Sequence, residues 1–193
     1  MASILKVDTI QDQSGNNIIN ESSDTITIGA SGDTITIPSG ATMTVPNGGL
    51  SGQNYPAFQA TLVASQNISN DTVTTGQYSI EGFDTDGCYD TGTYRFTPTT
   101  AGKYVIGLVQ RTNNFNASRI LAVIRKNGNT VIQFEMGNGG NFDTLNGSAI
   151  ITFNGTTDYV DCALYQNSGT TQTFQGGPGS EWGSLFFGYR IGS

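Results

Sequence analysis

Short stretches of alternating apolar and polar residues recur near the start of this 193-residue chain. Thr25-Ile26-Thr27-Ile28 is followed nine residues later by Thr34-Ile35-Thr36-Ile37 and eight residues after that by Thr42-Met43-Thr44-Val45. Between these tetrads lie segments of Gly, Pro, Ser, Ala and Asn, a composition typical of turns. Each repeat unit therefore predicts a short strand followed by a corner.

A strand of this length cannot bury its own apolar side chains, because only two of them face the same way. Stacked units, or several chains wound together, would bury them along one axis. Three units are too few for a stable solenoid of one chain, so residues 23–55 are predicted to form a stalk of three intertwined chains, a triangular β-prism. Its predicted core is Ile26, Ile28, Ile35, Ile37, Met43 and Val45. The alternative is a flexible Thr/Gly linker, against which the regular spacing of large aliphatic residues argues.

Residues 1–22 precede the repeat and carry apolar residues of their own. Ile4, Leu5, Val7 and Ile10 lie ahead of a turn at residues 15–17. This segment could be a pair of strands that caps the stalk, or a peg that docks into a larger assembly. We favour docking, because an apolar end exposed to water is an aggregation hazard unless something covers it.

From about residue 56 the pattern changes to strand-like segments that alternate with turn-rich separators. The predicted strands are residues 57–63, 72–80, 94–97, 102–111, 119–126, 130–135, 148–153, 159–166 and 184–191. Asn127-Gly128 between two of them predicts a hairpin turn. No sustained 3.6-residue apolar period is present, so helix should be scarce. We therefore predict an all-β protein whose residues 56–193 form a β-sandwich of jelly-roll or immunoglobulin type.

The charge of the chain excludes several partner classes. The formal net charge is -7, with 8 Lys and Arg residues in total. A nucleic-acid binder needs clustered cations, and so does a protein that adheres to anionic lipid. The first residues, MASILKVDTIQDQ, lack the apolar run of a signal peptide, and no later segment is long and apolar enough to span a membrane. We expect synthesis in a cytoplasm and no membrane insertion.

The candidate chemistry of the chain is sparse, and we expect no enzyme and no cofactor. The sequence has no His, which excludes Ser-His-Asp and Cys-His catalysis. Cys88 and Cys162 are expected to be reduced thiols, with a disulfide as the alternative. A carboxylate pair, Asp84 with Asp86 or Asp158 with Asp161, could in principle cleave a glycosidic bond. A carbohydrate depolymerase is therefore an alternative function, although a sugar groove usually needs a much longer β-helix.

Two further sets of residues are candidates for binding. Asp84, Asp86 and Asp90 could hold calcium, but Cys88 interrupts the usual acidic ladder, and solvated loop carboxylates are the alternative. Asn114, Phe115 and Trp182 lie in Asn- and Gly-rich loops where an aromatic ring could meet a sugar or protein receptor. The alternative is that the aromatic rings pack under their own loops or at a seam between chains.

Several segments of the second half are similar in order and spacing to one known family. They are Phe58-Gln59-Ala60, Ile80-Glu81-Gly82-Phe83-Asp84, residues 89–98, Ala101-Gly102-Lys103-Tyr104, Arg125-Lys126-Asn127-Gly128 and residues 184–191. This part resembles the globular head of the complement q subunits, the jelly roll shared with tumour necrosis factor. The resemblance implies a compact homotrimer. By alternation, Tyr89, Tyr94, Phe96 and Tyr104 are predicted to face the interior of a half-buried sheet.

A three-fold stalk and a three-fold head together resemble a bacteriophage tail fibre or spike. The opening MASILKVDTIQDQSGN is also similar to the start of marine phage tail-fibre proteins. The collagen-type repeat and signal peptide of animal complement proteins are missing, which argues against an immune role. We therefore expect a homotrimeric structural protein of a phage virion, assembled in the host cytoplasm. Its N-terminus would dock to other tail or capsid proteins, and its head would bind a host-surface glycan or protein. The alternative is a capsid or tail decoration protein without a receptor.

Overall fold

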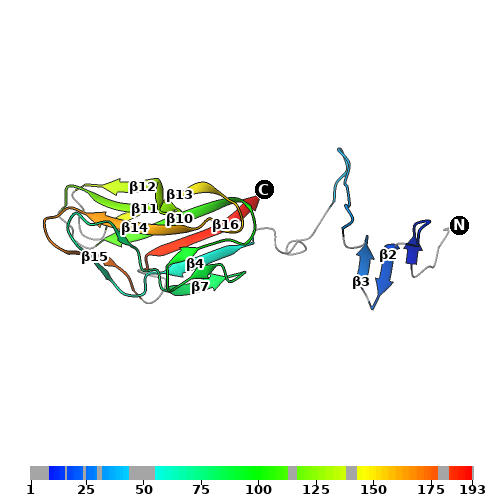
Figure 1. The fold of residues 1–193 in the computed structure, drawn as a ribbon, viewed down its shortest axis with the longest axis horizontal. Coiled ribbons are helices and arrows are strands. Elements are labelled where there is room, and N and C mark those ends of the chain that lie inside the picture. Colours follow the sequence, from blue (N-terminus) through cyan, green and yellow to red (C-terminus); the bar gives the residue numbers. More distant parts are fainter. Residues whose placement is uncertain are drawn as a thin grey trace. The chain divides into compact units, whose positions relative to one another are not determined.

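The computed structural model describes residues 9–15, 17–23, 25–29, 32–43, 55–112, 117–137, 143–177 and 183–192. The chain divides into two compact units, residues 1–49 and 50–193 (Figure 1). All regular structure in the described residues is β-strand, so the predicted all-β class is confirmed. Among the residues that the structure describes, no helix is long and apolar enough to cross a membrane.

The N-terminal unit contains an antiparallel sheet of three strands in sequence order, β1 (Thr9–Gln11), β2 (Asn17–Ser22) and β3 (Thr25–Ile28). The turn between β1 and β2 contains Gly15, whose φ of 85° is easily adopted only without a Cβ atom. The first tetrad of the repeat is β3. Residues 34–37 of the second tetrad form no strand, contrary to the prediction. A strand needs a hydrogen-bonded neighbour, and the single chain pairs none with this tetrad.

The C-terminal unit, the head, holds the remaining strands in two sheets. A seven-stranded sheet has the order β5-β15-β10-β16-β4-β7, with β13 also paired to β10, and a six-stranded sheet has the order β12-β11-β14-β9-β8, with β6 beside β14. The bounds are β4 (Ala57–Thr61), β5 (Gln66–Ile68), β6 (Thr74–Thr75), β7 (Ile80–Asp84), β8 (Tyr89–Asp90), β9 (Arg95–Phe96), β10 (Gly102–Thr112), β11 (Ile120–Lys126), β12 (Asn129–Met136), β13 (Thr144–Phe153), β14 (Val160–Gln166), β15 (Gln172–Gln175) and β16 (Leu185–Gly192).

The longest strands pair as the turn chemistry predicts. Lys126 and Asn129 close a two-residue hairpin loop between β11 and β12. Within it, Asn127 and Gly128 both have positive φ, 52° and 79°, as a type I′ turn requires. The predicted hairpin is confirmed. Strand β10 is the centre of the seven-stranded sheet, because it pairs with β13 on one side and with β16 on the other.

The core of the head lies between the two sheets and is rich in aromatic rings. Phe58 from β4 stacks on Phe96 from β9 at a centroid distance of 4.3 Å and on Tyr89 at 5.0 Å. Phe186 from β16 meets Phe58 edge to face at 5.0 Å. Such pairs add about 0.5–1.5 kcal/mol each beyond their buried area. This cluster therefore joins strands of both sheets.

Two details of the sequence prediction for the head were wrong. Tyr89, Phe96 and Tyr104 are buried as predicted, but Tyr94 is only half-buried and has a φ of 59° in the turn between β8 and β9. It stands outside both strands, so the alternation argument does not apply to it. Residues 72–80 do not form the one strand that the sequence predicts. Of these, only Thr74–Thr75 form a strand, β6, until β7 begins at Ile80.

Two glycines with positive φ differ in their surroundings. At Gly155, with a φ of 72°, an added Cβ atom would collide with the backbone of Thr100 and Ala101. At Gly169, with a φ of 88°, nothing lies within 4 Å of the position a Cβ would take. Close backbone approach therefore requires glycine at residue 155, whereas only the left-handed conformation favours it at residue 169.

Candidate interaction surfaces

The outward side of the seven-stranded sheet is apolar along its middle strands. Successive residues of β10 alternate between the core and this outer side. Val105 lies on the outer side, paired with Ile150 of β13 and Tyr189 of β16. Ile150 is 65% exposed and Tyr189 is 39% exposed. Two residues after Val105 in β10, Gly107 pairs with Phe187 of β16, and the ring of Phe187 lies over it. A Cβ atom at residue 107 would collide with this ring.

The same side is polar on β4, which presents Gln59 and Thr61, and apolar again on β7. Phe83 of β7 pairs with Gln59 of β4, and Ile80 pairs with Thr61. Phe83 is 49% exposed and Ile80 is 48% exposed. The residues that make up this apolar sheet face are Ile80, Phe83, Val105, Ile150, Phe187 and Tyr189. Monomeric soluble proteins rarely present a wide apolar surface of this kind to water.

A second apolar feature lies at the edge of the sandwich, where β12 meets β13. Phe134 and Met136 pack against the core but stay partly exposed, because β12 is the last strand of its sheet. Here a hollow of about 290 Å³ is lined by Phe134, Glu135, Met136, Thr144, Leu145 and Asn146. Gly147 leaves room for the ring of Phe134, since a Cβ atom there would collide with it. This edge hollow differs in shape and composition from the apolar sheet face.

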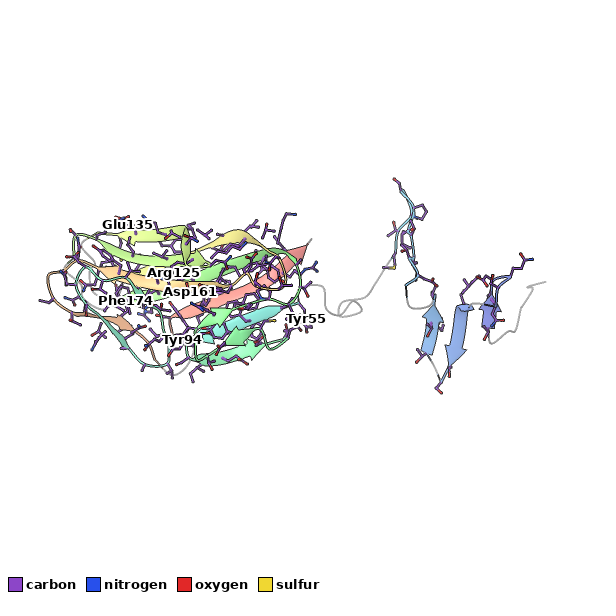
Figure 2. All side chains as sticks on the ribbon, viewed as in Figure 1. Tyr55, Tyr94, Arg125, Glu135, Asp161 and Phe174 are labelled. Carbon is purple, nitrogen blue, oxygen red and sulfur yellow. The ribbon has the colours of Figure 1, made fainter. Side chains whose placement is uncertain are left out.

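The six-stranded sheet carries a buried ion pair on its outer side. Asp161, whose side chain is 3% exposed, accepts hydrogen bonds from Nε and Nη2 of Arg125 at 2.7 and 2.9 Å (Figure 2). Arg125 Nη2 also donates to Oγ1 of Thr75 at 3.0 Å. A second guanidinium, that of Arg95, lies 3.9 Å from the same carboxylate and stacks over the ring of Tyr159. Burial and bidentate geometry make this pair a structural element.

The carboxylates proposed for a depolymerase are held by other groups. Asp158 forms an ion pair with Lys126 at 2.8 Å, and this hydrogen bond holds the pKa of the Asp158 carboxyl below its usual range. A glycosidase needs one carboxylic acid whose pKa is raised so that it stays protonated. Asp161 is bound to Arg125. The geometry of this pair therefore does not favour glycoside cleavage.

The calcium candidates serve as acceptors for turns. Asp84 Oδ2 accepts from the Tyr89 amide at 2.6 Å, and Oδ1 accepts from the Asp86 amide at 3.3 Å. Asp90 accepts from the Thr93 hydroxyl at 2.7 Å and from the Gly92 amide, and these bonds lower the pKa of its carboxyl. Within the described parts of the chain, no three acidic or thiol side chains lie together as metal ligands would. Calcium at these residues stays a sequence prediction.

Several predicted contact residues lie outside the described residues. They are Ile4, Leu5 and Val7 of the docking segment, Val45 of the stalk, and the receptor candidates Asn114, Phe115 and Trp182. The predicted stalk residues that are described are all exposed in the single chain, namely Ile26, Ile28, Ile35, Ile37 and Met43.

In the N-terminal sheet, the strand register brings together isoleucines from three different strands. Ile10 of β1 pairs with Ile19 of β2, and Ile19 pairs with Ile28 of β3. Ile26 lies on the same side, two residues from Ile28. We call these four the isoleucine row. The sequence predicts docking for Ile10 and the stalk core for Ile28, and it assigns Ile19 to neither. Only the strand pairing brings the three together.

Both cysteines are buried and unpaired, as expected from the sequence. Burial raises the pKa of the Cys162 thiol well above its usual value, because the charged thiolate is poorly solvated in the core. Cys88 Sγ lies 3.8 Å from Oγ1 of Thr99. Neither thiol has the exposed, electropositive surroundings of a reactive cysteine.

No protein-family model and no curated protein matches the chain, whereas its fold resembles many solved structures. The globular domain of zebrafish complement 1qA matches with a TM-score of 0.53 and 16% identity, over 70% of this chain and 97% of that one. Murine APRIL matches with 0.53 and 9% identity, over 69% and 98%. Eiger TNF from S. frugiperda matches with 0.51 and 9% identity, over 72% and 94%. At these identities the likeness shows the fold alone, and it confirms the jelly roll.

Proposed function

We propose that this chain is a homotrimeric structural protein of a phage virion, a short tail fibre or spike. In this proposal its N-terminal end docks to other virion proteins and its head binds a host-surface glycan or protein. The observation that carries the homotrimer is the apolar sheet face of the head. Its exposed and partly exposed aliphatic and aromatic side chains come from four strands of one sheet, β13, β10, β16 and β7. Such a surface is typical of an interface between chains.

The head also offers two unlike surfaces for the contact. A ring of three copies needs a heterologous interface, in which one patch on a subunit meets a different patch on the next. The apolar sheet face and the edge hollow at Phe134 and Met136 are two such patches. The sequence resemblance to the complement q head implies the same three-fold association.

The virion assignment is supported by the chain ahead of the head. Its opening residues are similar to those of marine phage tail-fibre proteins, and its Thr-Ile repeat leaves large aliphatic side chains exposed in a single copy. A solvated linker would not keep Ile26, Ile35 and Met43 in water. A stalk formed from three copies explains both the repeat and the exposure.

Two measurements on the purified full chain test the proposal. Light scattering should give about three times the chain mass of 20.4 kDa. In an adsorption assay, saturating protein should occupy the receptor on susceptible cells and reduce phage attachment. A single-chain mass would refute the homotrimer. A trimer that leaves adsorption unchanged would refute receptor binding and favour the decoration protein, whereas release of reducing sugar from host polysaccharide would favour a depolymerase.

A further inference from the structure

The isoleucine row lies on one side of a sheet that has only one layer; Glu21 is paired with Ile26 there, and Ile18, beside Ile19 in β2, is also exposed, at 46%. Ile10, Ile19 and Ile28 lie side by side across β1, β2 and β3, and each is at least one third exposed. On the other side of the sheet, Thr9 and Thr27 occupy the paired positions on either side of Asn20. A three-stranded sheet is stable in water only when its apolar side is covered. The described residues of this unit supply no second layer.

We propose that the isoleucine row is covered by the same row of two further copies of this chain. The inference rests on the proposed homotrimer and changes one assignment within it. Ile10 then belongs to the seam between copies, together with Ile19, Ile26 and Ile28. In this version of the proposal, only residues before Thr9 dock to the virion.

The tether between the two units favours copies over any other occupant. The row ends at Ile28 and the first strand of the head begins at Ala57, so 28 residues connect the sheet to the head of the same copy. Once three heads associate, each sheet is held near two identical sheets at an effective concentration of about 1 mM. A different protein would have to compete from free solution.

The charge of this part of the chain gives the seam a testable signature. The N-terminal unit, residues 1–49, holds five acidic residues, Asp8, Asp12, Glu21, Asp24 and Asp33, against one cationic side chain, Lys6. Copies of this unit repel one another electrostatically, so apolar contact must supply the attraction. Added salt screens that repulsion and should strengthen the seam. A cationic partner protein would show the opposite dependence.

Cysteine cross-linking of the full chain tests the inference, because the two native thiols are buried. Ile10→Cys and Ile28→Cys place a thiol on the row. Thr9→Cys and Thr27→Cys are matched controls at the adjacent positions of the same strands, on the opposite side of the sheet. A maleimide dye first verifies that each new thiol reacts, and a short bismaleimide then links thiols of neighbouring copies.

We expect linked two-chain species from Ile10→Cys and Ile28→Cys at roughly ten times the yield of the controls, reflecting the high local concentration of facing rows. That yield should rise with sodium chloride. Equal yields from both sides of the sheet, or reactive row thiols that do not link, would overturn the inference. Light scattering distinguishes failure of this inference from failure of the proposed homotrimer. A mass of three chains without cross-linking through the row refutes the seam but not the homotrimer, whereas a single-chain mass refutes both the seam and the homotrimer.

Discussion

Ile150→Asp in the head should dissociate the protein without unfolding the single chain. Ile150 is 65% exposed on the apolar sheet face, beside Val105 of β10. Because the side chain already meets water in one copy, the substitution should change the stability of that copy by no more than about 0.5 kcal/mol. Its effect should appear where a neighbouring copy covers the residue.

The magnitude follows from what a neighbour must bury. Full burial of an isoleucine side chain is worth about 1.5–3 kcal/mol. With 65% of Ile150 still exposed, about 1–2 kcal/mol of that remains to be gained on association. Aspartate forfeits this gain and brings a carboxylate into the interface, at a cost of several kcal/mol. Each interface should therefore weaken by about 4 kcal/mol or more, roughly a thousandfold in its association constant.

Light scattering at matched chain concentrations, with circular dichroism to verify the fold, measures the effect. Val73→Asp is the control, since Val73 is also β-branched and 61% exposed but precedes β6, which belongs to the other sheet. We expect a single-chain mass for Ile150→Asp at micromolar concentration and an unchanged mass for Val73→Asp. If both variants keep the wild-type mass, or if both lose it, the apolar sheet face is not the interface.

Three further predictions concern the stability of the head. Arg125→Met should lower the free energy of unfolding by about 3–5 kcal/mol in urea titrations, because it leaves a buried carboxylate without its main partner; Arg119→Met, which breaks an exposed pair, should cost less than about 1 kcal/mol. Gly155→Ala should cost more than Gly169→Ala, about 3 against 1 kcal/mol, since only the former adds a backbone collision to the strained φ; similar losses would contradict this. Burial raises the pKa of Tyr104 to about 12, so its contribution to stability should be complete below pH 10 and disappear as pH rises through 12; Tyr104→Phe should reduce this alkaline loss in unfolding titrations.

Local chemistry predicted much of the head. The Asn127-Gly128 turn, the long strand β10 and the buried Phe96 follow from turn preference and two-residue alternation, which depend on near neighbours only. The short strands β5 and β15 have no such signal. They are strands because each is hydrogen-bonded to a segment distant in sequence, and β15 pairs with both β5 and β10.

The interaction surfaces were only partly predictable, because they too depend on pairing between separate strands. Exposed isoleucines in the repeat were identified by their spacing. The isoleucine row was not, because whether Ile10 faces Ile19 depends on the register of β1 against β2, and a shift of one residue would move it to the other side. The apolar sheet face likewise combines residues 70 positions apart, Ile80 and Ile150, which only the completed sheet brings to one surface.

The burial of both cysteine thiols affects how the protein withstands oxidation. Dissolved oxygen and other oxidants attack exposed thiolates more readily than buried, protonated thiols. With Cys88 and Cys162 inside the sandwich, and the Cys162 thiol held in its protonated form, neither sulfur is readily oxidised or joined by a disulfide to another molecule. The head should therefore keep its fold and form no disulfide-linked aggregates during long storage in air without a reductant.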